Sequence, residues 1–218
     1  MIFTRLEQSI KSMKELRRLE ILKANQEQQE KTDQKYKQLS IAVHSVVHIL
    51  EYTHSNLQFT ITPETADSLA ALLKKMANAV SNGLADQDVV SEAEQDLRSI
   101  QLALKKEWAK HFSSITAATV GTLNVLRGLS VPEIATYLTK ISSATAWSLN
   151  NSTFIGLKDA LTGAEDLIHG LHLDPTIVDF LGKMNSGKAN ISDLNEDILS
   201  WIYSNHLEKK IKLSFSAK

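Results

Sequence analysis

The chain has 218 residues and a formal net charge of −1, and 43% of its residues are hydrophobic. This share of hydrophobic residues supports a folded core and excludes wholesale disorder, while the small net charge provides no global attraction to nucleic acid or to an acidic membrane. The absence of cysteine excludes disulfides, thiolate zinc sites and cysteine nucleophiles, and only 8 Gly and 3 Pro favour helices over a turn-rich β fold.

No segment has the composition of a secretion signal or a membrane span. Residues 1–22 lack an apolar run of about 7–15 residues, because Glu7, Glu15 and Glu20 interrupt them. No stretch approaches the roughly 18 uncharged apolar residues of a membrane-spanning helix. We therefore expect a soluble protein of the cytoplasm that does not act at a membrane.

Residues 2–24 have the pattern of an amphipathic helix. Their first apolar residues follow a heptad-like spacing of three, four and three: Phe3, Leu6, Ile10 and Met13. Leu16, Leu19 and Leu22 then step by three, which makes the stripe drift around the helix. Two heptads are fewer than the three or four that establish a coiled coil. Interspersed Glu residues indicate a solvated face and argue against a basic membrane-surface helix.

Residues 25–38 contain one aromatic and no aliphatic residue, so this segment has little to bury. Its Gln, Glu and Lys residues are good helix formers, and both a solvent-bridging helix and a flexible linker fit. We favour a helix that carries residues 2–24 away from the main body as an arm. An apolar stripe on such an arm needs a partner, such as a second copy of the chain.

Residues 39–54 resume the helical pattern, and residues 57–62 then alternate apolar and polar residues, which predicts a short strand. Thr62, Pro63 and Glu64 next form a helix start. The buried face of that helix is expected to use five apolar residues: Leu69, Leu72, Leu73, Met76 and Val80.

Residues 88–113 carry the longest apolar stripe, and they are predicted to form the central helix of the fold. Its members recur every three or four residues: Val89, Ala93, Leu97, Ile100, Leu104, Trp108, Phe112 and Ile115. The run 113–121 is rich in small and β-branched residues, so we expect the helix to fray or kink there.

The remaining helices are placed by their start signals. A capping box at Ser130–Glu133 opens a helix with Ile134, which is expected to reach Leu149 and to be broken at Asn150. Residues 153–168 form the next helix, and Asp174-Pro175 opens a short one. Asn195 caps a last helix, whose buried face is predicted to use Ile198, Leu199, Trp201 and Ile202.

Residues 210–215 alternate again, with Ile211, Leu213 and Phe215 on one face. This second strand pattern is consistent with pairing to residues 57–62 or with addition to the edge of a partner's sheet. The predicted fold is therefore mainly α: a helical bundle around a long central helix, with an N-terminal helical arm and one or two short strands. We divide it into an arm and connector at 1–38 and a bundle domain at 39–218.

One metal-binding pattern stands as an alternative. His44, His48 and Glu51 lie at i, i+4 and i+7 of one helix, and Glu51 and His54 have the E-x-x-H spacing found in di-iron bundles. A di-iron site needs this motif on two helices, together with two further acids. In this chain the E-x-x-H motif occurs once. Glu107 and His111 are spaced i, i+4 instead of i, i+3, and the Asp166/His169 pair has the shorter Asp in place of Glu. Neither a metal nor another cofactor is therefore expected.

Catalytic and nucleic-acid signals are weaker still. The chain lacks phosphate-loop, dinucleotide-binding and nucleophile-elbow motifs. Lys209, Lys210 and Lys212 cluster near the tail without interleaved aromatic residues, so direct nucleic-acid binding is only a second alternative.

These patterns favour a non-catalytic structural or adaptor subunit, which docks with copies of itself or with other subunits of a cytoplasmic complex. Small helical accessory proteins of this kind occur in bacterial machines, including defence complexes, but this comparison is an analogy by fold class alone. The predicted docking residues are Phe3, Leu6, Ile10, Met13, Ile211, Leu213 and Phe215.

Overall fold

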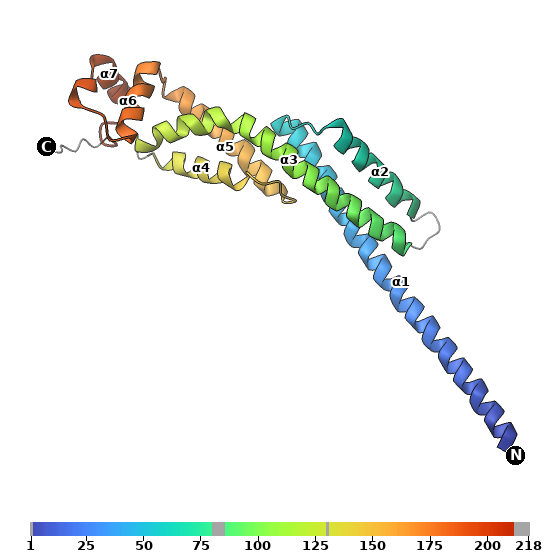
Figure 1. Cartoon of the computed structure of the whole chain (residues 1–218). Coiled ribbons are helices and arrows are strands. Elements are labelled where there is room, and N and C mark those ends of the chain that lie inside the picture. Colours follow the sequence, from blue (N-terminus) through green and yellow to red (C-terminus); the bar gives the residue numbers. More distant parts are fainter. Residues whose placement is uncertain (1, 80–85, 130, 212–218) are drawn as a thin grey trace. The chain divides into compact units, whose positions relative to one another are not determined.

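The structure is a computed structural model that describes residues 2–79, 86–129 and 131–211, with side chains described from Met13 onward. Within these ranges the chain is helical and contains no strand (Figure 1), which confirms the predicted mainly-α fold. Its elements are α1 (Ile2–Leu57), α2 (Pro63–Ala79), α3 (Gln87–Leu126), η1 (Arg127–Leu129), α4 (Pro132–Ser143), α5 (Asn151–Gly170), α6 (Pro175–Asn185), η2 (Ile191–Asp193) and α7 (Glu196–Ser204).

The chain divides into two compact units. The first unit comprises Met1–Leu50 and Thr60–Leu104, and the second comprises Glu51–Phe59 and Lys105–Lys218. The long helices α1 and α3 contribute residues to both. The predicted domain boundary at residue 38 separates an arm from a bundle that is expected to fold independently. The division into two units does not test this boundary, which stays a prediction.

In the first unit, α1 packs against α2 and the first half of α3. Apolar residues from the three helices, three or four positions apart, form its core: Leu39, Val43, Val46, Ile49, Leu69, Leu72, Met76, Val90, Ala93, Leu97, Ile100 and Leu104. Thr62 Oγ1 caps α2 by accepting from Thr65 N at 3.4 Å, as the sequence predicted. Leu73, predicted to be buried, is 45% exposed because it lies on the outer side of α2, and Val80 lies outside the described residues.

Residues 25–38 are helical and continue α1 without a break. Thr32 is 3% exposed, and its hydroxyl donates to the Gln28 carbonyl. Tyr36 Oη donates to the Met76 carbonyl at 3.1 Å, and Gln28 Nε2 donates to Gln87 Oε1 at 2.9 Å. Of the two predicted alternatives, the structure therefore has the helix, and its C-terminal half packs on α2 and α3.

The strand predicted at 57–62 is wrong. Leu57 is the last residue of α1, and Gln58 follows it with a φ of 56°. Leu57 and Phe59 are both buried because the turn directs them into the core of the second unit, which produces the apolar alternation without a sheet. Ile211, at the start of the second predicted strand, belongs to no regular element, and residues 212–215 lie outside the described residues.

An aromatic cluster forms the core of the second unit. Trp108 of α3 is fully buried, and its ring centroid lies 5.3 Å from that of Phe59, 5.9 Å from that of Trp147 and 4.9 Å from that of Phe154. Its Nε1 donates to the Ala144 carbonyl at 2.8 Å. Edge-to-face rings and a satisfied indole N–H make this a favourable way to bury a large aromatic residue.

The helix predicted to fray or kink at 113–121 does not fray, because α3 runs without interruption to Leu126. Thr116 and Thr119 are buried within the second unit, and Thr116 Oγ1 donates to the Phe112 carbonyl at 2.7 Å. Tertiary packing here outweighs the weak helix propensity of small and β-branched residues.

The fourth helix is shorter than predicted. Val131, without a side-chain cap, precedes α4, while Ser130 of the predicted capping box lies outside the described residues. The helix ends at Ser143 because the next residues turn inward to bury Ala144 and Trp147, and this leaves Leu149 44% exposed. Asn150, expected to end this helix, instead caps the start of α5.

The C-terminal helices begin where the sequence predicted. Asp174 and Asn195 each accept a backbone N–H three residues on, both at 2.9 Å, to open α6 and α7. Trp201 is buried as predicted, and its Nε1 donates to the Leu171 carbonyl at 2.6 Å. Trp108 and Trp147 are buried as well. Leu199, expected on the buried face, is 39% exposed because it lies beside that face.

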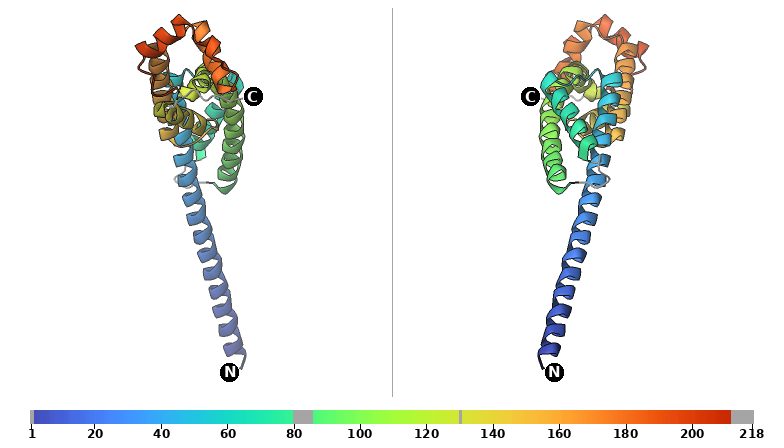
Figure 2. Two further views of the ribbon diagram at one scale, coloured as in Figure 1. Left: turned by 90° about the vertical axis from the view of Figure 1, so that its left-hand side faces the viewer. Right: turned by 90° about the vertical axis from the view of Figure 1, so that its right-hand side faces the viewer.

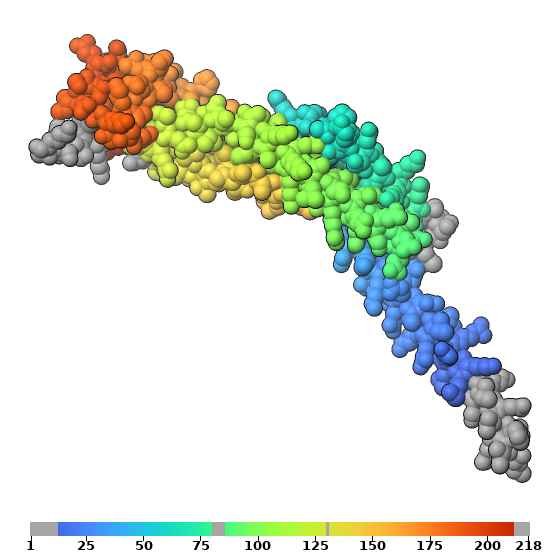
Figure 3. Space-filling view, in the orientation of Figure 1, coloured from blue at the N-terminus to red at the C-terminus, as the bar shows by residue number. Residues whose placement is uncertain are grey.

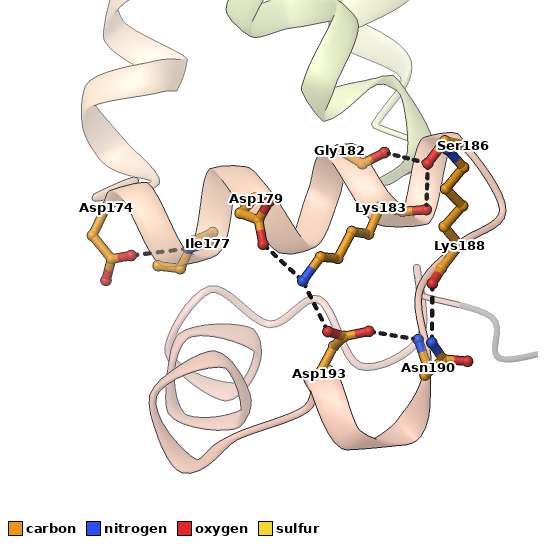
Figure 4. Close-up of polar contacts among 9 residues, drawn as sticks. All are labelled: Asp174, Ile177, Asp179, Gly182, Lys183, Ser186, Lys188, Asn190 and Asp193. Carbon is orange, nitrogen blue, oxygen red and sulfur yellow. Dashed lines mark hydrogen bonds and ion pairs between the residues drawn. The ribbon is translucent and has the colours of Figure 1, made fainter.

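A lysine of α6 holds η2 in place (Figure 4). Lys183 Nζ lies 2.9 Å from Asp179 Oδ2 and 3.0 Å from Asp193 Oδ1. The other oxygen of Asp193 accepts from Asn190 N at 2.8 Å. The backbone N–H of Asn190, followed by Lys183, lowers the pKa of the Asp193 carboxyl below its ordinary value.

Replacing Trp108 with Ala should destabilise the second unit by about 3–5 kcal/mol, the usual cost of removing a buried aromatic side chain. Trp108→Phe should cost less, because it keeps a ring in the cluster and loses only the hydrogen bond to Ala144 and part of the packing. Urea unfolding followed by far-UV circular dichroism measures both. A loss below about 1 kcal/mol for Trp108→Ala would contradict the role given to this cluster.

Asp193 should stabilise the fold in a pH-dependent way. Since its native pKa lies below the ordinary value, the unfolded state binds more protons, and the stabilisation is present above the ordinary pKa and lost as the pH falls through the native one. Asp193→Asn should therefore lower the melting temperature near pH 7, with the difference shrinking towards about pH 2. A difference that does not depend on pH would contradict this expectation.

Candidate protein-binding surfaces

The arm, defined here as residues 13–28 of α1, is the most exposed part of the described chain. In the first unit it extends past the ends of α2 and α3, as both views of Figure 2 and the space-filling view of Figure 3 show. Five of its large apolar side chains are more than half exposed: Met13 (69%), Leu16 (61%), Leu19 (62%), Ile21 (55%) and Leu22 (51%). No described residue covers them.

Three of these side chains share one side of the helix. Leu16, Leu19 and Leu22, which we call the leucine face, step by three, so each lies about 60° round the axis from the last. Glu15 and Lys23 lie about 40° to either side of Leu19, within this face, and Glu20 and Arg18 lie about 100° to either side, at its borders. The charges along the face are therefore balanced. Lys14 and Arg17 lie about 140° and 160° from Leu19, on the opposite side of the helix.

The predicted docking residues fall on this helix and on the tail. Phe3, Leu6 and Ile10 belong to α1, but their side chains lie outside the described part, whereas Met13 is exposed. Ile211 is half-buried, and Leu213 and Phe215 lie outside the described residues. The docking role of these residues stays a prediction. The sequence pattern showed Leu16, Leu19 and Leu22 stepping by three, but the predicted docking residues on α1 end at Met13 because the heptad-like spacing ends there.

A second surface is a groove between α3 and α4 in the second unit, with a volume of about 610 Å³. Its apolar lining comes from Phe112 and Val120 on α3 and from Leu138 and Ile141 on α4. The groove runs along α3 as far as Arg127. Nothing in the sequence pattern indicated it, because it depends on how two helices distant in sequence pack.

The hydroxyls that line the groove are already bonded to their own helices. Thr116 donates to the Phe112 carbonyl at 2.7 Å, and Thr139 donates to the Ala135 carbonyl at 2.8 Å. Three further hydroxyls do the same within 3.0 Å: those of Ser113, Ser142 and Thr145. With these donors used, the residues present mainly hydrocarbon, so the groove suits an apolar occupant.

The charges near the groove are mostly positive. Arg127 lines one end, and Lys140 lies between the lining residues Thr139 and Ile141. Lys110 lies one turn before Ser113, and all three cations are exposed. Glu133 near the start of α4 is the acid closest in sequence to the lining residues.

The four candidate metal ligands do not form a site. His44, His48, Glu51 and His54 are all exposed. His54 Nδ1 lies 3.2 Å from the Phe59 carbonyl, which can only accept, so this nitrogen carries a proton and donates. Across the described ranges, no group of three or more His, Asp or Glu residues has a geometry that could hold a metal.

His111, paired with Glu107 in the sequence pattern, has a structural partner. Its Nε2 donates to the Leu57 carbonyl at 2.8 Å, at the last residue of α1. His54 and His111 thus both bond carbonyls of the turn at 57–59. In the described residues, no helix is both long enough and apolar enough to cross a bilayer.

Comparison of the chain with protein-family models, with curated proteins and with solved structures finds no match. The case for a function therefore rests on the exposed leucine face and on the groove.

If the histidines of α1 are ordinary surface residues, His44→Ala with His48→Ala should change the melting temperature by no more than about 2 °C. A chelator should likewise leave the melting temperature unchanged, and elemental analysis should find less than one iron, manganese or zinc per chain. Stoichiometric metal that the double variant loses would instead support the metal-binding alternative.

Proposed function

We propose that this chain is a non-catalytic assembly subunit, which joins a cytoplasmic multi-protein complex by binding a protein partner with its arm. The exposure of Leu16, Leu19 and Leu22 on one side of a helix is the observation that supports this proposal. Contiguous exposed apolar surface on a helix that extends from a folded core is typical of an interaction site.

The leucine face supplies part of the energy that specific binding needs. Complete burial of a fully exposed leucine side chain is worth about 1.5–3 kcal/mol. Because these three leucines are 51–62% exposed, covering them provides about 2.5–5 kcal/mol in total. Association itself costs several kcal/mol of translational and rotational freedom. Neighbouring apolar residues such as Met13 and Ile21 would therefore have to contribute for the complex to reach micromolar affinity, which corresponds to about 8 kcal/mol.

A helical arm suits this task because its backbone needs no partner. All of residues 13–28 belong to α1, so their amide and carbonyl groups are bonded within the helix. Only side chains are left to be covered, and a partner that offers an apolar groove can cover them in the helix-in-groove mode.

We expect the wild-type chain to self-associate and Leu16→Asp with Leu19→Asp to abolish this association, because two carboxylates would replace the apolar contact. Size-exclusion chromatography with light scattering measures the mass of both. Residues 13–22 contribute nothing to a buried core, so the double variant should keep the wild-type circular dichroism spectrum and melting temperature within about 2 °C.

Lys14→Asp with Arg17→Asp is the matched control, since it places two aspartates on the opposite side of the same helix. This variant should assemble like the wild type. Equal loss of assembly in both variants would mean that net charge, and not the leucine face, governs association. Unchanged assembly in the leucine variant would contradict the proposed function.

A further inference from the structure

We propose that the leucine face binds the leucine face of a second copy of this chain, with the two α1 helices antiparallel and Leu19 beside the two-fold axis. Each arm covers the other, so one contact buries the exposed leucines of both copies. This inference rests on the proposed function, because it names the partner of the arm and the direction in which that partner lies.

The first argument is the symmetry of the leucine face. Leu16 and Leu22 lie three residues before and after Leu19, about 60° to either side of it. A two-fold axis beside Leu19 and perpendicular to the helix places Leu16 of each copy at the height of Leu22 of the other, and Leu19 against Leu19. The face is therefore its own complement under this rotation, as a contact between identical surfaces requires.

The second argument is charge within the face. Glu15 and Lys23 lie four residues before and after Leu19, about 40° to either side of it. In the antiparallel pair, Glu15 of each copy lies at the height of Lys23 of the other, so an ion pair forms on each side of the central leucines. If the arms ran parallel in register, Glu15 would meet Glu15 and Lys23 would meet Lys23. Like charges in contact oppose pairing, so these two residues select the antiparallel direction.

The same reversal matches charges along the whole N-terminal half of α1. Turning the helix round about Leu19 exchanges residues whose numbers add up to 38, twice 19. Between residues 5 and 33, every charged residue that exchanges with another charged residue meets the opposite sign. The pairs are Arg5/Asp33, Glu7/Lys31, Lys11/Glu27, Glu15/Lys23 and Arg18/Glu20. Leucines and charges thus share one centre of symmetry, which pairing with a second copy explains and binding to an unrelated protein does not require.

Charges at the borders of the face act more weakly. Arg18 and Glu20 lie about 100° from Leu19, so at the usual spacing of packed helices they lie about 10 Å or more from the charges of the other copy. This distance is close to the Debye length at physiological salt. Glu20 is also about as far from the second Glu20 as from the second Arg18, so the two effects largely cancel. Glu15 and Lys23 therefore determine the direction.

The first unit leaves room for this pairing. Beyond the arm, the side of α1 that continues the leucine face is exposed at Glu30, Gln34 and Lys37. The buried residues Thr32 and Leu39 lie about 140° and 160° from the direction of Leu19, on the side that faces the core. The end of a second arm can thus run along the exposed side of α1 without meeting α2 or α3, and the arm itself extends freely beyond them (Figure 2).

Charge-swap variants test the arrangement. Glu15→Lys alone and Lys23→Glu alone each place like charges opposite one another, so each should weaken self-association at least about tenfold in sedimentation equilibrium. An equal mixture of the two variants should form a heterodimer about as tight as the wild-type dimer, because every contact between like charges becomes one between opposite charges. The wild type should have twice the mass of one chain, since a contact between identical surfaces closes at two copies.

Lys14→Glu is the matched control for Lys23→Glu. It makes the same change of charge on the opposite side of the same helix, about 140° from Leu19. Its dissociation constant should stay within about twofold of the wild-type value. These positions are exposed, so all three variants should keep the wild-type circular dichroism spectrum.

Disulfide crosslinking tests the direction independently in a chain that has no cysteine of its own. Positions 12 and 26 lie seven residues before and after Leu19, each about 20° from its direction. A mixture of Ser12→Cys and Gln26→Cys should therefore form a linked heterodimer on mild oxidation, because the antiparallel pair brings these positions within disulfide range. Gln26→Cys alone should not link, since its two copies lie about 21 Å apart along the helix axis.

The possible outcomes separate this inference from the proposed function. If Leu16→Asp with Leu19→Asp abolishes association, but the charge swaps have no effect and Gln26→Cys links to itself, the arms pair in parallel. The antiparallel inference is then overturned, while the proposed function stands. If the leucine variant and the charge swaps all assemble like the wild type, both proposals are overturned. A wild-type chain that stays monomeric at about 100 µM overturns the pairing of arms.

Discussion

Trp108 holds the second unit together, and the groove depends on it. Its ring contacts Phe59 from the turn after α1, Trp147 from the turn after α4, and Phe154 from α5. Its indole N–H fixes the Ala144 carbonyl at the end of α4. One side chain of α3 thereby determines where α4 ends and how it lies against α3, and these two helices are the walls of the groove.

A different constraint acts on the first unit. Its core reaches along α1 only as far as Thr32 and Tyr36, because residues 25–31 have no aliphatic side chain to bury. The leucines of residues 16–22 are thus separated from their own core by a polar stretch of one continuous helix. The backbone of that helix is hydrogen-bonded, but these leucine side chains are not buried. For this reason we propose that the arm serves binding and does not contribute to folding of the core.

The arm and the groove together suggest how a chain without a recognisable catalytic motif can act. One surface is convex and exposes leucine side chains, and the other is a concave, largely apolar groove. The hydroxyls that line the groove donate within their own helices, so both surfaces present mainly hydrocarbon.

The sequence by itself determined the features that depend on local interactions. The starts at Thr62, Asp174 and Asn195 were correct because a cap is a hydrogen bond to a residue two or three positions away. The stripe that includes Leu97 and Leu104 was correct because helical periodicity is a property of the chain alone.

Only the tertiary structure decided the rest, because it depends on partners distant in sequence. Residues 113–121 are helical because packing of the second unit outweighs their propensity, and residues 57–59 form a turn because their apolar side chains enter an aromatic core. Leu73 is 45% exposed because it lies on the side of α2 that faces away from the core. The groove, likewise, exists only once α3 and α4 have packed.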